Sequence, residues 1–265
     1  MTSYFERLLI KILKYFKTDL LEHAHVQIGV GHNTYLSGEE NVVENILSKV
    51  LKKEPKVIFD VGANIGEYAK MLANRFKSAQ IYCFEPVPAN YERLVQNTGN
   101  LKTINVLTAL GSQKGNIKLY IGDNNKDGSM ATLYRETLDK VFLFAGDVNQ
   151  VVESTVTTLD DFCVDKINKI DFLKIDVEGH ELEVLKGAFN LINENKIDVV
   201  QFEFNEFNIF SKSFMYDFYQ VLNAYDFYRI MPQNKLYPMG DYTSSLEIFR
   251  YQNILAVHRS LNYVN

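Results

Sequence analysis

The chain has 265 residues, of which 46% are hydrophobic and 23% charged, an ordinary composition for a globular protein that can bury a substantial core. Its formal net charge of -5 argues against duplex nucleic acid as a partner, because there is no basic excess to neutralise phosphates. The two cysteines, Cys83 and Cys163, lie in apolar runs and lack the spacing of a zinc or redox motif. We therefore expect buried free thiols and a reducing, cytoplasmic location.

The first predicted helix lies near the N-terminus and is amphipathic. Apolar residues recur at helical spacing with basic residues between them: Tyr4, Phe5, Leu8, Leu9, Ile12, Leu13 and Phe16 against Arg7, Lys11, Lys14 and Lys17. These charges exclude a membrane span or a signal peptide. We expect the apolar stripe to pack on the same domain or on the second subunit of a homodimer. Peripheral contact with an anionic membrane surface is the alternative.

Two further segments complete a predicted N-terminal helical and connector extension, residues 1–54. Residues 26–40 form a glycine-containing connector, and residues 41–54 form a helix that ends before Pro55. We expect one domain from residue 55 to residue 265.

Strand and helix patterns alternate through this domain. Strands are predicted at residues 56–62, 79–86, 102–111, 170–179, 196–205 and 251–259, with an extra edge strand at 115–122; helices are predicted at 65–76, 88–100, 180–195 and 213–226, and residues 153–164 form a strand and a short helix. Alternation requires crossover connections, so we expect an α/β fold with a doubly wound, mainly parallel, Rossmann-like sheet and helices on both faces. Residues 123–150 are polar and weakly periodic, which predicts a long loop or lid.

The turn after the first strand of the domain combines glycines with polar residues. In VIFDVGANIG, Asp60 lies near the end of a buried strand, and Gly62, Asn64 and Gly66 precede the next helix. Ligands of doubly wound sheets bind beyond the carboxyl ends of the strands, where glycine lets the backbone approach them closely. The Gly-x-Asn-x-Gly spacing differs from the G-x-G-x-x-G of dinucleotide binders, which favours a ligand without a pyrophosphate. A purely structural strand–helix turn is the alternative.

An acidic residue follows the second strand. Glu85 lies 19 residues beyond Gly66, close to the offset of about 20 residues at which an acid binds a ribose hydroxyl. A ribose without a pyrophosphate favours S-adenosylmethionine over NAD, and the Asp60 carboxylate can face the positive end of its methionyl group. The residues predicted to bind this cofactor are Asp60, Gly62, Asn64, Gly66 and Glu85.

Four segments in order, FDVGANIGEYA, FEPVPANYERL, TLDDF and LKIDVEGHELEVLKGA, strongly resemble the FkbM family of S-adenosylmethionine-dependent methyltransferases. The resemblance covers residues 56–260, and the Asp-Val-Glu-Gly stretch is its most distinctive part. It implies a methyltransferase domain and O-methylation, typically of a sugar or polyketide hydroxyl. We expect a sugar or glycoconjugate precursor as the acceptor. A polyketide or other small hydroxylated metabolite, and a cofactor-binding module without catalysis, are the alternatives.

Methyl transfer to a hydroxyl needs an aligned acceptor oxygen and a base that removes its proton. Asp176, Glu178 and His180 follow the fourth core strand, and the two acids share a side if the chain stays extended. The dipole of the next helix disfavours a charged imidazole, so His180 can act as a neutral base near pH 7. We predict a catalytic role for these three residues, without assigning the base to one of them.

The end of the following strand, FEFNEFN, carries Glu203 and Asn205, which we predict to contact the substrate. Some catechol-type relatives on this fold bind Mg²⁺ through acids after the fourth and fifth strands, where Asp176 and Glu203 offer oxygen ligands. FkbM proteins are not defined by a metal, so S-adenosylmethionine is the expected cofactor and a divalent metal is not favoured.

Overall fold

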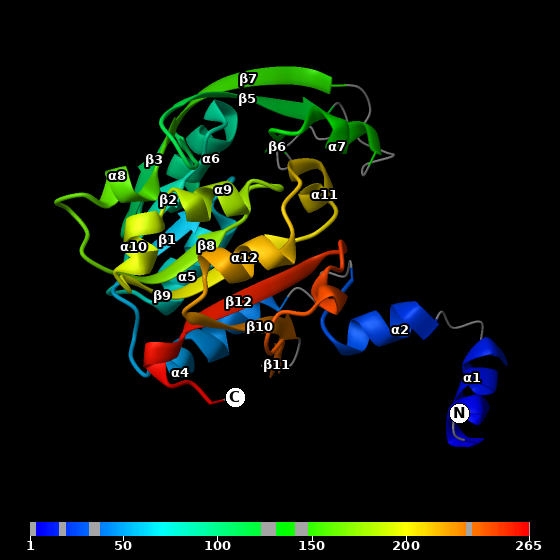
Figure 1. Ribbon diagram of the computed structural model, residues 1–265. Coiled ribbons are helices and arrows are strands. Elements are labelled where there is room, and N and C mark those ends of the chain that lie inside the picture. Colours follow the sequence, from blue (N-terminus) through cyan, green and yellow to red (C-terminus); the bar gives the residue numbers. More distant parts are fainter. Residues whose placement is uncertain are drawn as a thin grey trace.

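The computed structural model describes residues 4–15, 20–31, 38–122, 131–140, 148–231 and 235–264. Over these residues the chain forms two sheets surrounded by helices (Figure 1). The larger sheet has the order β11 (Lys235–Pro238), β10 (Tyr225–Met231), β12 (Gln252–His258), β9 (Ile197–Phe204), β8 (Ile170–Ile175), β1 (Val57–Val61), β2 (Gln80–Phe84) and β3 (Thr103–Val106). The smaller sheet has the order β4 (Ala109–Leu110), β7 (Val148–Thr157), β5 (Gly115–Gly122) and β6 (Ala131–Thr132).

The described helices connect and cover these strands. They are α1 (Tyr4–Tyr15), α2 (Leu20–Gln27), α3 (Glu39–Asn41), the π-helical η1 (Val42–Ile46), α4 (Leu47–Leu51), α5 (Glu67–Arg75), α6 (Pro88–Thr98), α7 (Arg135–Lys140), α8 (Leu159–Cys163), α9 (Glu181–Lys186), α10 (Phe189–Asn193), α11 (Phe207–Ser211), α12 (Met215–Val221), and the 3₁₀ turns η2 (Ser244–Leu246) and η3 (Arg259–Leu261).

The larger sheet is mainly parallel, which confirms the predicted doubly wound α/β fold. Strands β9, β8, β1, β2 and β3 run parallel to one another. Strands β12, β10 and β11 join the β9 edge in antiparallel orientation. The carboxyl ends of the five parallel strands therefore lie at one edge of the sheet, where the predicted site residues follow β1, β2, β8 and β9.

Successive side chains of the central strands point to opposite faces of this sheet, and a hydrophobic core lies on each face. Phe59 and Val61 of β1 belong to the core that α8, α9, α10 and α12 cover. Ile58 belongs to the opposite core, which α4, α5 and α6 cover. Both cysteines are free and buried in these cores, Cys83 against α5 and Cys163 on α8, which confirms their prediction as buried thiols.

Several predicted elements differ from the structure around the second sheet. The expected strand at 102–111 breaks at Leu107 and Thr108, so that β3 ends one sheet and β4 enters the other. The expected edge strand at 115–122 is β5, which pairs with β6 and β7 in the smaller sheet. The predicted loop at 123–150 includes β6, α7 and the start of β7; residues 123–130 and 141–147 lie outside the described residues.

Two differences concern the C-terminal half. The helix expected at 180–195 is two helices, α9 and α10, separated at Gly187, whose own hypothetical Cβ would lie 2.0 Å from the carbonyl oxygen of Gly111. Strands β10 and β11 and helix α11 were not predicted, because each apolar run is short and lacks a clear period. These antiparallel strands lie beyond β9 at one end of the strand order, so the five parallel strands remain adjacent to one another.

The segment from Gly38 to Leu51 packs into the same core as the predicted methyltransferase domain. It forms one continuous helical run, α3, η1 and α4, as expected for residues 41–54, although it begins earlier. Val42, Leu47 and Val50 are fully buried in the core beneath α5. We propose that the domain boundary lies before this run, since separating it would expose that core.

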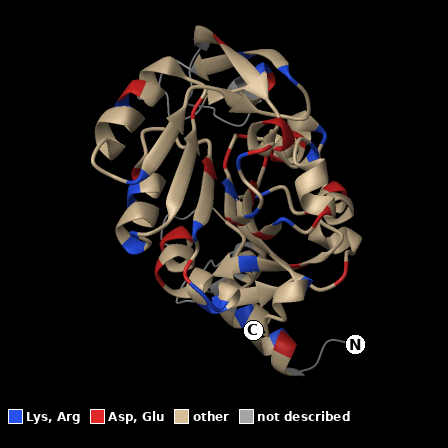
Figure 2. Ribbon diagram, turned by 90° about the vertical axis from the view of Figure 1, so that its left-hand side faces the viewer, with Lys and Arg blue, Asp and Glu red and all other residues tan. Residues whose placement is uncertain are grey.

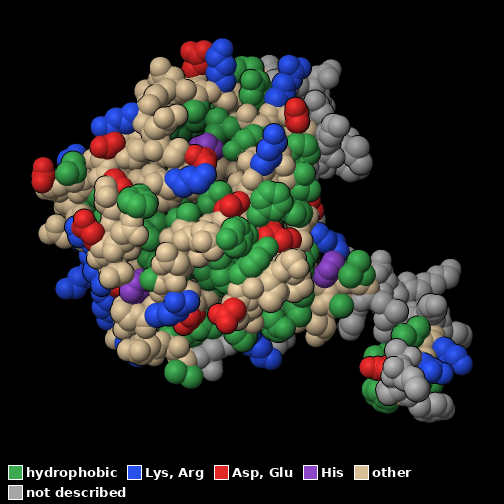
Figure 3. Space-filling view, in the orientation of Figure 1, with side chains coloured by type: hydrophobic (Ala, Val, Ile, Leu, Met, Phe, Trp, Pro, Cys, Tyr) green, Lys and Arg blue, Asp and Glu red, His purple; other side chains and the backbone are tan. Residues whose placement is uncertain are grey.

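Helix α1 lies apart from both sheets (Figures 1 and 3). Its apolar side chains are exposed: 73% for Phe5, 43% for Leu8, 46% for Leu9 and 44% for Ile12. The structure therefore does not place these four side chains of the predicted stripe against the chain's own domain, and Phe16 lies outside the described residues. None of the helices in the described part of the chain is long and apolar enough to cross a membrane.

We expect the apolar stripe of α1 to be covered by a second subunit, because an exposed stripe of this kind marks an interaction surface. Deleting residues 1–20 should then convert a dimer into a monomer, measured by light scattering coupled to size exclusion. A dimeric mass that persists after the deletion would exclude α1 from the dimer contact.

Candidate active site

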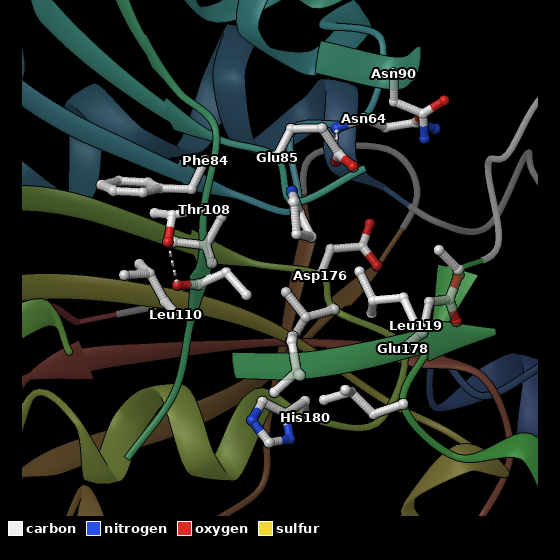
Figure 4. A pocket seen from close by; sticks show the side chains of 18 residues that line it. Asn64, Phe84, Glu85, Asn90, Thr108, Leu110, Leu119, Asp176, Glu178 and His180 are labelled. Carbon is white, nitrogen blue, oxygen red and sulfur yellow. Dashed lines mark hydrogen bonds between the residues drawn. The ribbon is translucent and has the colours of Figure 1, made fainter. Parts of the chain in front are cut away.

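A pocket lies beyond the carboxyl ends of β1, β2 and β8, beneath β5 and β6 of the smaller sheet (Figure 4). Its empty volume is about 710 Å³, part of which is open to solvent. The residues that line it are Val61, Gly62, Asn64, Phe84, Glu85, Pro86, Asn90, Thr108, Ala109, Leu110, Ile117, Leu119, Ala131, Leu133, Asp176, Val177, Glu178 and His180. Six predicted site residues therefore meet at one pocket: Gly62, Asn64, Glu85, Asp176, Glu178 and His180.

Glu85 is fixed at the pocket wall by the backbone of two loops. Its Oε2 accepts a hydrogen bond from the N–H of Asn64 at 2.9 Å, and its Oε1 accepts one from the N–H of Val87 at 2.8 Å. The residue is only 4% exposed. Burial raises the pKa of Glu85 to about 7, although both backbone hydrogen bonds lower it. The Asn90 side chain also hydrogen-bonds to this carboxylate and lowers its pKa. A carboxylate has about four acceptor sites, so capacity remains for a ligand in the pocket.

Asn64 lies in the left-handed region, with φ of +48°, in the turn that donates to Glu85. Its Oδ1 is buried and has no hydrogen-bond partner among the described residues. A buried polar atom without a partner costs free energy unless a ligand or a water satisfies it. Asn64 thus offers an acceptor atom on a pocket-lining side chain.

Both glycines of this turn lie too close to other parts of the protein to carry a side chain. A Cβ on Gly62, at φ +80°, would lie 1.8 Å from the carbonyl oxygen of Asp176. A Cβ on Gly66, at φ +88°, would lie 2.8 Å from Cδ1 of Leu94 on α6. Packing within the protein therefore accounts for both glycines, and their predicted contact with the cofactor stays a prediction. Gly62 lines the pocket, whereas Gly66 lies outside its lining and allows α5 to pack on α6.

Asp60 lies outside the lining of the pocket, on the opposite face of β1 from Phe59 and Val61. It is fully buried, and the nearest cation is the Lys174 ammonium group, 3.7 Å from Oδ1. Burial raises the pKa of Asp60, and Lys174 opposes that shift. The positive group facing Asp60 in this structure is therefore a lysine side chain, and its predicted contact with the cofactor stays a prediction.

The chain turns sharply after Asp176, so the extended conformation expected for residues 176–178 is wrong. Glu178 has φ of +54° and Gly179 has φ of +98°. Oε1 of Glu181 stabilises this turn by accepting the N–H groups of Val177 and Gly179 at 3.0 and 3.1 Å. Asp176 and Glu178 still line the same pocket, and burial followed by the Asp176 charge raises the pKa of Glu178 well above its ordinary value.

His180 is the residue before the first turn of α9, and Figure 4 places it across the pocket from Glu85, with Asp176 between them. Its Nδ1 lies 3.3 Å from the hydroxyl oxygen of Tyr134, which follows β6. Burial lowers the pKa of His180 below its ordinary value of 6.5. A neutral imidazole is therefore expected at pH 7, with burial as the main cause in place of the helix dipole.

Glu203 and Asn205 lie at the end of β9 and do not line the pocket. Nδ2 of Asn205 donates to Oε1 of Glu203 at 2.9 Å, and Oδ1 of Asn205 accepts the N–H of Phe207 at 2.7 Å. Burial, together with the charges of Asp176 and Glu178, raises the pKa of Glu203 well above its ordinary value. Their substrate contact stays a prediction. In the described part of the chain, no group of three or more His, Cys, Asp or Glu side chains is arranged to hold a metal ion.

The sequence analysis missed the residues that come from the smaller sheet. Ile117, Leu119, Ala131 and Leu133 cover the pocket with apolar side chains. The hydroxyl of Thr132 also donates to the carbonyl oxygen of Glu178 at 3.3 Å. No motif marks these residues, since their position depends on the pairing of β5 with β6.

Comparison with known proteins adds an independent observation. The sequence model of a protein family, described as Methyltransferase FkbM domain, matches residues 60–229 of this chain. Hexuronic acid methyltransferase AglP of Haloferax volcanii is 29% identical over 168 residues, which cover 63% of this chain and 63% of that protein. 2-O-methyltransferase NoeI of Sinorhizobium fredii is 25% identical over 174 residues, which cover 62% of this chain and 70% of that protein.

Among solved structures, Methyltransferase FkbM from Methylobacillus flagellatus is similar with a TM-score of 0.49 and 16% sequence identity. The similarity covers 86% of this chain and 48% of that chain. The chain thus matches less than two thirds of the length of AglP and about half of this solved chain.

Proposed function

The chain belongs to the FkbM methyltransferase family, and we propose that it transfers the methyl group of S-adenosylmethionine to a hydroxyl oxygen of a sugar or glycoconjugate precursor. The acceptor class is supported by the names of two relatives, one a hexuronic acid methyltransferase and one a 2-O-methyltransferase.

The arrangement of Glu85 is the single observation that carries the cofactor assignment. A nearly buried carboxylate is held by two backbone N–H groups at the wall of a pocket beyond β1, β2 and β8. A ribose has two neighbouring hydroxyl donors, which match the two carboxylate oxygens. The unpartnered Oδ1 of Asn64 fits a further donor of the same ligand.

When bound, S-adenosylmethionine supplies an electrophilic methyl group on a positively charged sulfur. The chain's own residues then have two tasks, to align the acceptor hydroxyl and to accept its proton. Asp176 and His180 border the pocket and can accept a proton, Asp176 at a carboxylate oxygen and His180 at a neutral ring nitrogen. Glu178 is the weaker candidate because burial and Asp176 favour its protonated form.

The acceptor class is tested by incubating the protein with isotope-labelled S-adenosylmethionine and a panel of hexosides, hexuronides and one hydroxylated polyketide. A product carrying one labelled methyl group on a glycoside is expected. Methylation of the polyketide alone would move the acceptor to the class of small hydroxylated metabolites. Cofactor binding without any methylated product would support a non-catalytic binding module.

The cofactor assignment also predicts a stability change. S-adenosylhomocysteine should raise the midpoint of thermal unfolding, because a ligand that binds only the native state stabilises it by mass action, by about 2.7 kcal/mol at 100 times its dissociation constant. NAD should leave the midpoint unchanged, since the turn after β1 lacks the pyrophosphate spacing. Differential scanning fluorimetry measures both, and equal shifts with the two ligands would contradict the assignment.

A further inference from the structure

Lys174 is a buried cation at the centre of the larger sheet. It lies on β8 with neighbours on both sides, β1 and β9, and only 5% of its surface is exposed. Figure 2 shows that most of the strand ribbon carries neither basic nor acidic residues, so a lysine here is unusual. A buried ammonium group is costly unless it is paired and hydrogen-bonded.

The register of the strands supplies its first polar neighbours. Asp60 of β1 and Gln201 of β9 pair with Lys174, so the three side chains form a row across the sheet. The ring of Tyr68, from α5, covers the ammonium group at 4.9 Å from the ring centre. The hydroxyl of Tyr68 donates to Oε1 of Gln201 at 3.1 Å, which closes the row from the helix side.

The closest carboxylate to Lys174 belongs to the pocket. Nζ of Lys174 donates to Oδ2 of Asp176 at 3.1 Å, whereas Oδ1 of Asp60 is 3.7 Å away. Asp176 lines the pocket and lies two residues beyond Lys174, on the same side of the chain. Lys174 thus contacts the candidate base from beneath the pocket without lining it.

The N-terminal segment adds a third carboxylate to this cluster. Oε1 of Glu39, in α3, accepts a hydrogen bond from Nε2 of Gln201 at 3.2 Å. Burial raises the pKa of Glu39, Lys174 lowers it, and Asp176 and Asp60 raise it. Burial alone would lower the pKa of Lys174, but Asp176, Asp60 and Glu39 together raise it well above its ordinary value. The lysine therefore stays charged.

We propose that Lys174 is a positioning residue of the methyl-transfer site, which holds the Asp176 carboxylate toward the pocket, and that Glu39 of the N-terminal segment tunes the charge of this cluster. The inference deepens the proposed function, since it assigns Asp176 to the reaction. It also makes part of the segment before residue 55 a component of the catalytic unit.

The proposal predicts opposite pH shifts for two substitutions. Lys174→Met removes the cation, so the neighbouring acids keep their protons to higher pH, and the rising limb of the pH–rate profile moves up by about one unit. Burial raises the pKa of Glu39, so Glu39→Gln removes a negative charge only where Glu39 is ionised, and there that limb moves to lower pH. The titratable groups that face the cluster are Glu39 of α3, Asp60 of β1, Tyr68 of α5, Cys83 of β2, Asp176 and Glu178 after β8, Glu203 of β9 and Tyr251 before β12.

The rate itself should also change. We expect Lys174→Met to lower kcat about 10²-fold with little change in KM for S-adenosylmethionine, since a misplaced group costs about that much. Lys53→Met is the matched control. Nζ of Lys53 pairs with Asp171 and lies 3.7 Å from Oδ2 of Asp198, and none of these three residues lines the pocket. The control should keep the wild-type rate and profile. Equal losses in the two lysine variants, or shifts in the same direction for Lys174→Met and Glu39→Gln, would overturn the proposal.

A second measurement does not depend on the acceptor. Calorimetric titration of S-adenosylhomocysteine should give Lys174→Met an affinity close to the wild-type value, because the lysine contacts Asp176 and does not line the pocket. A loss of affinity as large as the loss of kcat would overturn the positioning role while the cofactor site stands. Absence of binding by the wild type would instead contradict the proposed function.

Discussion

A protein carrying Asp176→Asn and His180→Ala is expected to transfer methyl groups about 10²–10⁴-fold more slowly than the wild type, the usual contribution of a positioned base. Both side chains border the pocket, and either can accept the proton of an acceptor hydroxyl. Affinity for S-adenosylhomocysteine should stay close to the wild-type value, because the ribose is assigned to Glu85, across the pocket. Turnover with labelled cofactor and calorimetric binding measure the two quantities.

The pH dependence expected with His180 as the base follows from the protonation state of its imidazole. Burial lowers the pKa of His180 below 6.5, so the neutral, proton-accepting form persists below that pH. If His180 is the base, the rate should rise with pH through an ionisation below 6.5 and then stay level. Asp226→Asn is a matched control, since Asp226 is exposed on β10 and pairs with Arg259. The two substitutions are also tested one at a time. Wild-type rates in the single variants Asp176→Asn and His180→Ala would refute the catalytic assignment.

Glu85→Gln is expected to weaken cofactor binding by about 1.5–3 kcal/mol, which corresponds to a factor of about 10–150 in the dissociation constant. The substitution keeps the size of the side chain but removes the charge that strengthens hydrogen bonds from ribose hydroxyls. Glu92→Gln, an exposed site on α6, is the control for the same chemical change. Calorimetric titration measures the difference, and unchanged affinity in Glu85→Gln would place the ribose elsewhere.

The ionisation of Glu85 gives this prediction a pH dependence. Burial raises its pKa from 4.5 to about 7 in the folded chain, so the ligand-free fold loses stability as pH rises through this interval. Ribose hydroxyls donate to the ionised carboxylate, so binding should weaken as pH falls through about 7 and should release a proton below that pH. Titrations in buffers of different ionisation enthalpy measure the released proton.

Much of the parallel sheet could be predicted because its strands are apolar runs that end at glycine, proline or acidic residues. The β1–α5–β2–α6 unit and the β8–α9 connection follow directly from such punctuation. The break between β3 and β4 could not be predicted in this way. Leu107 and Thr108 continue the apolar pattern, and only the pairing of β4 with β7 separates the two strands.

The sequence could predict which residues line the pocket where a single residue follows a single strand. It could not predict contacts between side chains of different strands. Glu85 and Asp176 follow β2 and β8, so topology alone brings them to one pocket. Lys174 was visible as a lysine inside an apolar strand, but its partners depend on the register of β1, β8 and β9. Glu39 comes from a segment that the sequence pattern separates from the domain.

A crystal structure of the protein with S-adenosylhomocysteine tests the account most directly. We expect both ribose hydroxyls within hydrogen-bonding distance of the Glu85 carboxylate, an adenosine donor near Oδ1 of Asn64, and the sulfur atom facing Asp176. A ligand bound elsewhere, or bound here with its ribose away from Glu85, would contradict the proposed cofactor site.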